Sequence, residues 1–476
     1  MNGGTSFYWH DYETFGIDPC RDRPAQFAGL RTTYDLEPVG EPLAIYCKPA
    51  RDVLPTPFSC LITGITPQRA ERDGLIEAEF AARVHDELSA PGTCAVGFNS
   101  IRFDDEFTRN LLYRNFYDPY AREWENGNSR WDVIDLVRMC YALRPQGIEW
   151  PLRDDGTPSF RLEDLTAANR LWHQQAHDAL SDVHATIAIA RLMRVRQPRL
   201  FDWFFALRRK QRAFALLDCI QRTPVLHVSS RYPAERGCIA MVVPLAIHPD
   251  QPNKVIVYDL DSDPAPLLEL DPDDIADRVF TPRADLPEGI ERIPLKAVSA
   301  NRSPALAPLS VLAGVDLQRI RLDRDRCLTH LQKLNGADLS LKVQAVFAAA
   351  ERKMNGTRDP ELSLYGGFLG DLDRKLLRDV RGTPPDQLAG RTFAFQDVRC
   401  RDLLFRYRAR NFPQTLSLSE SADWEQYRRT KLTTKTDTTP LTLDDYFREI
   451  ATQRATATGA QSAILDALED WGHQVL

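Results

Sequence analysis

The sequence predicts a multidomain α/β protein, in which a mixed strand-and-helix domain precedes a β-rich domain and a helical domain. Three observations support this fold class. Strand-like and helix-like segments alternate up to about residue 197, short β runs separated by Pro, Asn and Asp follow, and helical patterns dominate after residue 339. At 476 residues, the chain is long enough for two to four domains.

The first 197 residues have the alternation that is typical of an α/β domain. Runs rich in apolar and aromatic residues predict strands, and apolar residues at helical spacing predict helices. Thr66-Pro67 predicts a helix start, because threonine caps a helix and proline fits its first turn. The expected strands are 7–10, 25–33, 42–47 and 93–98, and the expected helices are 78–88, 105–114, 134–143 and 179–194.

Near Gln197-Pro198 the pattern changes to short strands, which predict a small barrel or sandwich. Helical spacing returns after residue 339, and Lys353–Pro360 is the best candidate for a linker. We therefore expect domains at 1–197, 198–350 and 355–476. The expected strands are 225–228, 239–243, 255–259 and 267–270, and the expected helices are 339–352, 371–380, 401–410, 443–454 and 460–471.

The composition is that of a globular protein, with 43% hydrophobic and 27% charged residues. No window approaches 18 uninterrupted apolar residues and no secretory signal precedes the first strand, so we expect neither a membrane span nor export. The nine cysteines are scattered and include no Cys-x-x-Cys pair. This pattern argues against disulfides and structural zinc, and it favours the cytoplasm.

The net charge of −7 does not favour a nucleic-acid-binding protein, although net charge says little about a local groove. Two basic clusters, Arg208–Arg212 and Arg399–Arg410, are local exceptions. Each is either a solvated helix face or a surface that faces a nucleic-acid strand.

Acidic residues stand at three positions where a strand ends or a helix begins. Asp11 and Glu13 follow the first strand and share a face, because side chains alternate along a strand. Asp104 follows the fourth strand and precedes a helix. Asp182 lies in the first turns of the expected helix 179–194, five positions after His177. Taken singly, each acid has an ordinary explanation as a turn or helix-capping residue.

Together and in this order, Asp-x-Glu, Asn-x-x-x-Phe-Asp and His-x-x-x-x-Asp resemble the motifs of the DEDDh exonucleases, which have a ribonuclease H-like fold. Clustered carboxylates repel one another unless a cation lies among them, and hard oxygen donors suit magnesium or manganese. Two such ions can stabilise both oxygens of an in-line displacement at phosphorus. A histidine beside them can accept the proton of the attacking water, because its pKa is near neutrality.

Longer motifs resemble bacterial exonuclease I along the whole chain. The resemblance is dense before residue 210 and looser at about 230–400 and after 415. The motifs are His10-Asp-Tyr-Glu-Thr-Phe-Gly16, Asp22-Arg-Pro-Ala-Gln-Phe-Ala28, Leu61-Ile-Thr-Gly-Ile-Thr-Pro67, Tyr113-Arg-Asn-Phe-Tyr-Asp-Pro-Tyr120, Asn128-Ser-Arg-Trp-Asp132 and Phe405-Arg-Tyr-Arg-Ala-Arg-Asn-Phe-Pro413.

This resemblance implies a DEDDh nuclease domain, a Src-homology-3-like barrel with appended helices and a C-terminal helical domain, which together enclose single-stranded DNA. It implies a monomeric exodeoxyribonuclease that uses Mg²⁺, or Mn²⁺ as a substitute, in DNA repair and recombination. The activity would be processive release of 5′-mononucleotides from a 3′ end. Arg208–Arg212 and Phe405–Arg410 would face the strand. A chain cut after about residue 353 would keep its catalytic carboxylates in place, but its processivity would be reduced and its binding to long strands weakened.

The resemblance also implies roles for the acidic residues. Asp11, Glu13 and Asp182 would hold one metal ion. Asp11 and Asp104 would hold the second, with Asp104 bound directly or through water. His177 would be the general base.

The DNA contacts implied by the resemblance are arginines, which pair with phosphates, and aromatic rings, which stack on bases. Glu13 and Arg161 would contact the 3′-terminal nucleotide. The residues along the strand would be Arg109, Tyr120, Trp124 and Arg138. The two aromatic residues could instead belong to the core.

The implied protein partner is the acidic, apolar C-terminal tail of the single-stranded DNA-binding protein. A receptor for such a tail needs an apolar pocket with a basic rim. Arg144 and Trp203 are the candidates by resemblance, and Arg319 or Arg321 could add charge.

Two other functions are open to a chain with these motifs. A DEDDh exoribonuclease would use the same acids, but more than half of this chain follows the nuclease domain, which is unusual for such enzymes. A non-catalytic single-strand-binding adaptor could lose the acids, whereas all five catalytic positions hold competent residue types here.

Overall fold

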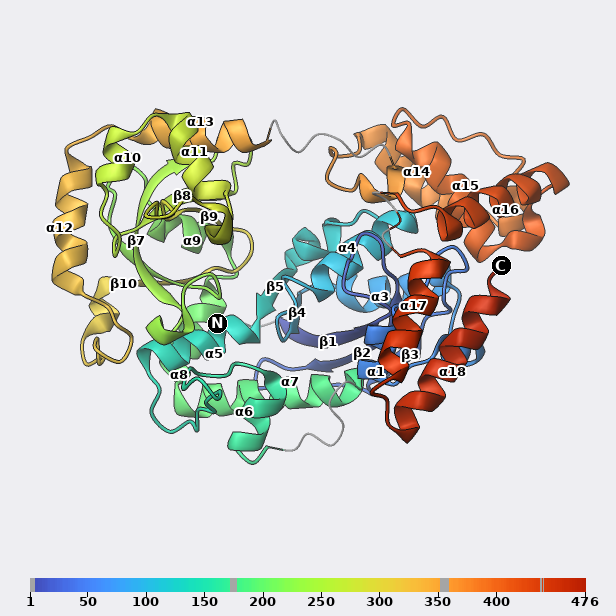
Figure 1. Cartoon of the computed structure of the whole chain (residues 1–476), viewed down its shortest axis with the longest axis horizontal. Coiled ribbons are helices and arrows are strands. Elements are labelled where there is room, and N and C mark those ends of the chain that lie inside the picture. Colours follow the sequence, from blue (N-terminus) through green and yellow to red (C-terminus); the bar gives the residue numbers. More distant parts are fainter. Residues whose placement is uncertain (1–4, 172–177, 352–358, 437–438, 440) are drawn as a thin grey trace. The chain divides into compact units, whose positions relative to one another are not determined.

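The computed structural model describes residues 5–171, 178–351, 359–436, 439 and 441–476 (Figure 1). These residues form two compact units. Unit 1 contains the described residues within 1–129, 173–184 and 357–476, and unit 2 contains those within 130–172 and 185–356. The predicted boundaries of the three domains stay predictions, because unit 1 combines segments from both ends of the chain. Across the described residues, no helix is both long enough and apolar enough to span a bilayer.

The catalytic acids predicted at the first strand lie in a mixed sheet of order β3-β2-β1-β4-β5. Its central strand, β1, pairs antiparallel with β2 and parallel with β4. The predicted strand 7–10 is longer in the structure, because pairing with β2 continues to Thr14 and places Asp11 and Glu13 inside the strand. The strands are β1 (Ser6–Thr14), β2 (Pro24–Thr32), β3 (Leu43–Tyr46), β4 (Thr93–Gly97) and β5 (Ser129–Asp132), within which the chain passes into unit 2.

Alternation along β1 places its two tyrosines and its two acids on opposite faces of the strand. Tyr8 and Tyr12 lie in a buried apolar cluster with residues of helix α3 (Glu77–Ser89). Asp11 and Glu13 therefore project from the opposite face of the strand. The pairing with β2 shifts register between Glu13 and the next residue, and such a bulge re-aims the neighbouring side chains.

The C-terminal helices complete unit 1, because they close two apolar clusters that the N-terminal segment begins. In one cluster, Trp471 is buried with Phe15, the residue that follows β1. In the other, Leu377 and Leu403 pack with Phe116, just after α4. Figure 1 shows α17 and α18 beside α1, in agreement with their contacts. The helices are α1 (Pro57–Thr63), α2 (Pro67–Asp73), α4 (Asp104–Arg114), α14 (Asp371–Gly382), α15 (Arg399–Asn411), α16 (Leu418–Thr433), α17 (Leu443–Arg454) and α18 (Gly459–Gln474).

A buried ion network, formed by Arg23, Asp52, Glu361, Arg410 and Lys431, joins the same two parts of unit 1. Arg410 donates to Asp52 through Nε and Nη2 at 2.9 and 2.6 Å and also bonds to Glu361, and Lys431 lies 2.8 Å from Asp52. Nη2 of Arg23, the residue just before β2, lies 3.0 Å from a carboxylate oxygen of Glu361. Burial alone would raise the pKa of Asp52, but the two cations of the C-terminal segment hold that pKa well below its usual value.

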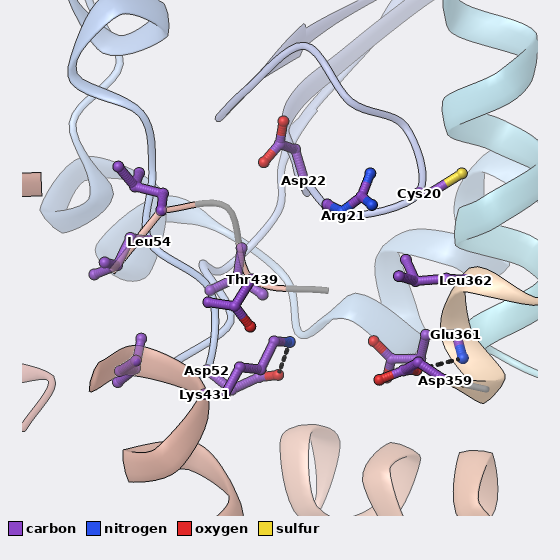
Figure 2. Close-up of a pocket in the computed structure, with 13 residues that line it drawn as sticks. Cys20, Arg21, Asp22, Asp52, Leu54, Asp359, Glu361, Leu362, Lys431 and Thr439 are labelled. Carbon is purple, nitrogen blue, oxygen red and sulfur yellow. Dashed lines mark hydrogen bonds and ion pairs between the residues drawn. The ribbon is translucent and has the colours of Figure 1, made fainter. Parts of the chain in front are cut away.

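A small crevice lies beside this network. Figure 2 shows Arg21 and Asp22 across the crevice from Asp52, Lys431 and Glu361. Its volume is ≈ 50 Å³, room for only a few water molecules. The crevice is therefore too small for a nucleotide.

The segment Phe405–Arg410 was predicted to face a nucleic-acid strand, but its three arginines are paired with carboxylates of unit 1. Arg406 lies 2.8 Å from Asp359, and Arg408 donates to both oxygens of Glu420. These guanidiniums are mostly buried and are neutralised inside unit 1. The reason is tertiary, because their carboxylate partners lie on other elements.

Unit 2 contains a five-stranded antiparallel sheet of order β10-β6-β7-β8-β9. The strand predicted at 267–270 is wrong, because α10 (Ala265–Glu269) covers that region and its prolines occupy a first turn where a missing N–H costs nothing. The strands are β6 (Val225–Val228), β7 (Ile239–Ile247), β8 (Lys254–Asp259), β9 (Leu295–Ser299) and β10 (Ala305–Pro308). The other helices are α5 (Val133–Leu143), α6 (Leu162–Ala168), α7 (Ala179–Arg196, which begins in unit 1), α8 (Pro198–Ala206), α9 (Lys210–Leu216), α11 (Pro272–Phe280), α12 (Arg324–Asn335) and α13 (Ser340–Glu351).

The structure also revises the expectation for a chain cut after about residue 353. Such a chain loses α14 to α18, which exposes both shared apolar clusters and removes Arg410 and Lys431 from Asp52. We expect this truncated chain to unfold in unit 1 rather than to keep its catalytic carboxylates in place.

Replacing Arg410 by alanine tests the buried ion network. Arg410→Ala leaves Asp52 and Glu361 buried without their main cation, so we expect the free energy of unfolding at pH 7 to fall by about 3–5 kcal/mol. The deficit should narrow below about pH 4, where protonation relieves the two carboxylates. Urea unfolding measures both effects. Arg401→Ala, at an exposed position of the same helix, should change stability by less than about 0.5 kcal/mol; an equal loss in both variants would show that the network is not the cause.

Candidate active site

Three carboxylates gather where β1 ends. One carboxylate oxygen each of Asp11, Glu13 and Asp182 lies within 4.8 Å of the others. Asp11 and Glu13 come from the same face of β1, and Asp182 comes from the first turn of α7. The structure therefore brings together three of the four acids that the sequence predicts as metal ligands.

Asp104 is held against the same strand. Its Oδ1 accepts a hydrogen bond from the backbone N–H of Tyr12 at 3.1 Å. The parallel pairing of β1 with β4 ends at Trp9 and Val96. The N–H of Tyr12 lies beyond that end, and the Asp104 carboxylate accepts its hydrogen bond in place of a strand carbonyl. The donor residue, Tyr12, stands between Asp11 and Glu13 in the chain, so this bond brings the Asp104 carboxylate to the part of β1 that carries the two acids.

Neither helix-start acid is simply a cap. Asp104 is the first residue of α4, not the residue before it as predicted, and the capping position belongs to Phe103, whose side chain makes no capping bond. At α7 the capping bond is made by Asp178, whose Oδ2 accepts from the N–H of Ser181 at 3.2 Å. The sequence alone left capping open for Asp182, and the neighbouring Asp178 takes that role instead. His177 lies outside the described residues.

The electrostatics of the cluster are those of anions without a cation. Burial, followed by the charges of Asp104 and Glu13, raises the pKa of Asp11 well above its usual value. Burial, followed by the charge of Asp182, raises the pKa of Glu13 to about 8. The N-termini of α4 and α7 carry partial positive charge toward the acids, which offsets only part of the repulsion.

These residues fit divalent metal ions. The donor set is made only of hard oxygens, which magnesium, manganese and calcium prefer. Burial first, and the charges of neighbouring carboxylates second, raise the pKa values of Asp11 and Glu13, and a cation bound among the acids would offset both effects. Asp11, Glu13 and Asp182 could ligate a single ion, because their oxygens are close enough to share it.

Behind the acids, the first turn of α4 is fixed by a buried ion pair. Arg122 donates to Asp105, the neighbour of Asp104, at 2.6 Å, and both side chains are almost fully buried. His10, the neighbour of Asp11, is also buried, and burial lowers its pKa to about 4. His10 is therefore neutral at pH 7 and supports the strand without adding charge.

The predicted DNA contacts of unit 1 differ in how they are presented. Trp124 is 66% exposed. Tyr120 is partly buried, with its ring 5.3 Å from the Arg109 guanidinium and its edge against Phe368. Arg109 itself is buried, and it bonds to two glutamates and to Tyr365, a partner 256 residues away that carries no signal in the sequence.

In unit 2, Arg161 and Arg138 are also presented differently. Arg161 precedes α6, and its side chain is 65% exposed although it pairs with Glu163. Arg138 is buried in α5, where it donates to Asp135 at 2.8 Å and lies over the ring of Phe160.

The two predicted partner-binding residues both bond to the segment that carries β10. Trp203 is 38% exposed and donates from Nε1 to the carbonyl of Leu306 at 2.8 Å. Arg144 donates to the carbonyl of Val311 at 3.0 Å. A carbonyl oxygen does not neutralise a guanidinium, so this bond leaves the positive charge of Arg144 in place. Arg144 and Trp203 thus bond to carbonyls that are five residues apart in the chain.

Comparison with known proteins adds to this geometry. Family models match the chain as Exonuclease over residues 8–190, as Exonuclease I SH3-like domain over 208–349 and as Exonuclease I C-terminal domain over 358–475. Exodeoxyribonuclease I of Escherichia coli (strain K12) is 49% identical over 433 residues, which covers 90% of this chain and 91% of that protein.

Solved structures resemble the chain over nearly its whole length. An exonuclease I from Methylocaldum szegediense has a TM-score of 0.95 and 52% sequence identity, and covers 99% of each chain. The zinc-bound complex of E. coli exonuclease I with single-stranded DNA has a TM-score of 0.93 and 45% identity, again with 99% of each chain covered.

The mixed sheet, the acidic cluster on β1 and the match to the exonuclease model define an exonuclease of the kind that works with divalent metal ions. Within that class, this chain belongs to the exodeoxyribonuclease I family, and it is accordingly a DNA-hydrolysing enzyme. The resemblance predicted from the sequence is confirmed, as is the order of nuclease, SH3-like and C-terminal helical domains.

Metal binding at this cluster should release protons. Because the pKa of Glu13 is about 8, this carboxyl is mostly protonated at pH 7 and must ionise to become a ligand. We expect titration of the metal-free protein with Mn²⁺ at pH 7 to release about one proton or more per molecule, and fewer at pH 9. Calorimetry in buffers of different ionisation enthalpy measures the release. Glu13→Gln should release fewer protons; equal release by the two proteins would contradict the assignment of Glu13 as a ligand.

Proposed function

We propose that this protein is a 3′→5′ exonuclease that degrades single-stranded DNA processively to 5′-mononucleotides in DNA repair and recombination. The observation that carries the proposal is the gathering of Asp11, Glu13 and Asp182 within 4.8 Å, with Asp104 bonded to the same strand. Family membership supports DNA as the substrate. The single-stranded DNA held by the similar E. coli structure supports the choice of a single strand.

The cluster suits Mg²⁺, with Mn²⁺ as a substitute, because both ions prefer carboxylate and water ligands. Asp11, Glu13 and Asp182 would hold one ion, and Asp11 and Asp104 a second. When bound, such ions supply charge neutralisation at the phosphodiester and a lowered pKa of water. His177 would accept the proton of the attacking water, a role that its position in the motif beside Asp178 supports.

The strand itself would be bound by stacking and by phosphate contacts that do not read sequence. Trp124 is the most exposed of the proposed aromatic contacts. Tyr120 offers less of its ring, and it shares a small pocket with Phe368. Arg161 has an exposed guanidinium, as a contact with the terminal nucleotide requires, whereas the buried Arg138 fits a positioning role better.

The C-terminal tail of the single-stranded DNA-binding protein fits the end of α5. Arg144 and Arg319 both donate to backbone carbonyls there, so their charges are not cancelled by those bonds. Trp203 presents a partly exposed ring to the same segment. An acidic, apolar peptide would match this pairing of cations with an indole. The nine free cysteines support a reducing compartment such as the cytoplasm, and we expect a monomer.

Digestion of matched substrates tests the proposed function. With Mg²⁺, single-stranded DNA labelled at its 3′ end should release the label as a 5′-mononucleotide, whereas duplex DNA and RNA should be degraded much more slowly. Asp182→Asn should abolish hydrolysis but retain DNA binding, because it removes one metal ligand. Asp86→Asn, at an exposed acid of α3, should keep the wild-type rate. Faster digestion of RNA would favour an exoribonuclease, and binding without hydrolysis would favour an adaptor.

The proposed general base has its own test. His177→Ala should lower the hydrolysis rate by roughly 10²–10⁴-fold, the usual scale for losing a general base. The residual rate should rise with pH, because hydroxide replaces the missing base. A pH–rate profile of the variant measures this, and a profile with the wild-type shape would make His177 a bystander.

A further inference from the structure

Arg109, a proposed phosphate contact, already holds an anion on its fork. Its Nε and Nη2 donate to the two carboxylate oxygens of Glu123 at 2.7 and 2.9 Å. Its Nη1 donates to Glu106 at 2.9 Å and to the hydroxyl of Tyr365 at 3.0 Å. The Tyr365 hydroxyl in turn bonds to Glu106. Parallel bonds of this kind are those that an arginine fork makes with a phosphate.

The charges of this set oppose DNA. The guanidinium of Arg109 bonds to the carboxylates of Glu106 and Glu123. A second guanidinium, that of Arg122, lies 4.0 Å from Glu123 but is itself paired with Asp105 at 2.6 Å. Two cations therefore face three carboxylates, and the group carries a net negative charge when all three acids are ionised. The side chains of Arg109 and Glu123 are both less than a tenth exposed, so water screens their interaction only weakly. A backbone phosphate that approached this set would be repelled unless one carboxylate gave way.

Glu123 is the carboxylate whose displacement would free the fork, because it alone occupies the Nε–Nη2 edge of Arg109 among the bonds described above. Glu106 lies three residues before Arg109 on α4 and is also bonded to Tyr365. Glu123 instead ends a single 3-10 turn (Ala121–Glu123) and directly precedes the exposed Trp124. Rotation of its side chain would free the Nε–Nη2 edge of Arg109, while Glu106 and Tyr365 would still hold Nη1.

We propose that Glu123 occupies the phosphate-binding edge of Arg109 and is displaced by a backbone phosphate of single-stranded DNA. The inference rests on the proposed function, in which Arg109, Tyr120 and Trp124 contact the strand. Glu123 is then an affinity-determining residue that makes no favourable contact with the substrate. Because one anion replaces another on the same fork, each phosphate is held weakly at this position, and the strand can leave it readily between cleavages.

Equilibrium binding to the full-length protein tests the exchange. The probe is a fluorescein-labelled oligo-dT, followed by fluorescence anisotropy in EDTA so that no hydrolysis occurs. Glu123→Gln keeps the shape of the side chain but weakens its hold on Arg109, so we expect binding to tighten by about tenfold, the scale of one charge-assisted interaction. The matched control is Glu125→Gln, which removes the same charge two residues away, at an exposed position. Long-range attraction should rise alike in both variants, so the difference between them isolates the exchange.

A second pair of variants assigns the gain to Arg109. Glu123→Gln should tighten binding in the wild-type background but not in an Arg109→Ala background. Thermal melting checks that each variant is folded. If Glu123→Gln does not fold, Glu123→Asp serves instead, because the shorter acid cannot keep both bonds and should give a smaller gain that also depends on Arg109.

Each outcome decides the inference. Equal affinity changes in Glu123→Gln and Glu125→Gln, weaker binding by Glu123→Gln, or a gain that survives without Arg109 would overturn it. If the wild-type protein still degrades single-stranded DNA in any of these cases, only the role of Glu123 fails and the proposed function stands. If the wild-type protein neither binds nor degrades single-stranded DNA, the proposed function fails with it.

Discussion

Mutual repulsion among the carboxylates on β1, α4 and α7 is the constraint on which the rest of unit 1 depends. Asp11, Glu13 and Asp182 are held within 4.8 Å although their charges oppose that closeness. Burial and, after it, these neighbouring charges raise the pKa values of Asp11 and Glu13. Three features hold them there: the pairing of β1 on both edges, the bond from the Tyr12 N–H to Asp104, and the Asp105–Arg122 ion pair behind α4. The function follows from the same repulsion, because only a multivalent cation relieves it fully.

Unit 1 uses buried charge in two opposite ways. At the site, burial and the charges of neighbouring carboxylates raise the pKa values of Asp11 and Glu13. In the ion network, Asp52 and Glu361 are also buried, but arginine and lysine hold their pKa values low. Breaking such a pair leaves a buried charge unpaired, so the network fixes the C-terminal segment to the loops after β1 and β3. In the same unit, the ion network therefore stabilises the fold, whereas the clustered acids of the site oppose it.

Much of this architecture was predictable from the sequence, because local patterns carry it. The strands near β1 and β4, the cap at Thr66, the helix at Leu443–Arg454 and the acids themselves follow from periodicity and spacing. What failed depends on distant partners. Arg410 looked like a DNA contact because Asp52 lies 358 residues away. The bond from Tyr12 to Asp104 joins residues 92 apart, and α16 was missed because its buried face includes the charged Arg428 among apolar residues.

The interleaving of the two units has a consequence for biosynthesis. The first and last segments of unit 1 are separated by roughly 230 residues, broken only by 178–184. At ~5–20 residues per second, a ribosome needs roughly 10–50 s to cross that distance. During this interval Phe15 and Cys60 have left the ribosome, but Tyr446, Leu468 and Trp471, which cover them, have not been made. The nascent chain therefore carries an exposed apolar surface beside an unfinished nuclease site, and the enzyme becomes competent only when its last helix is released.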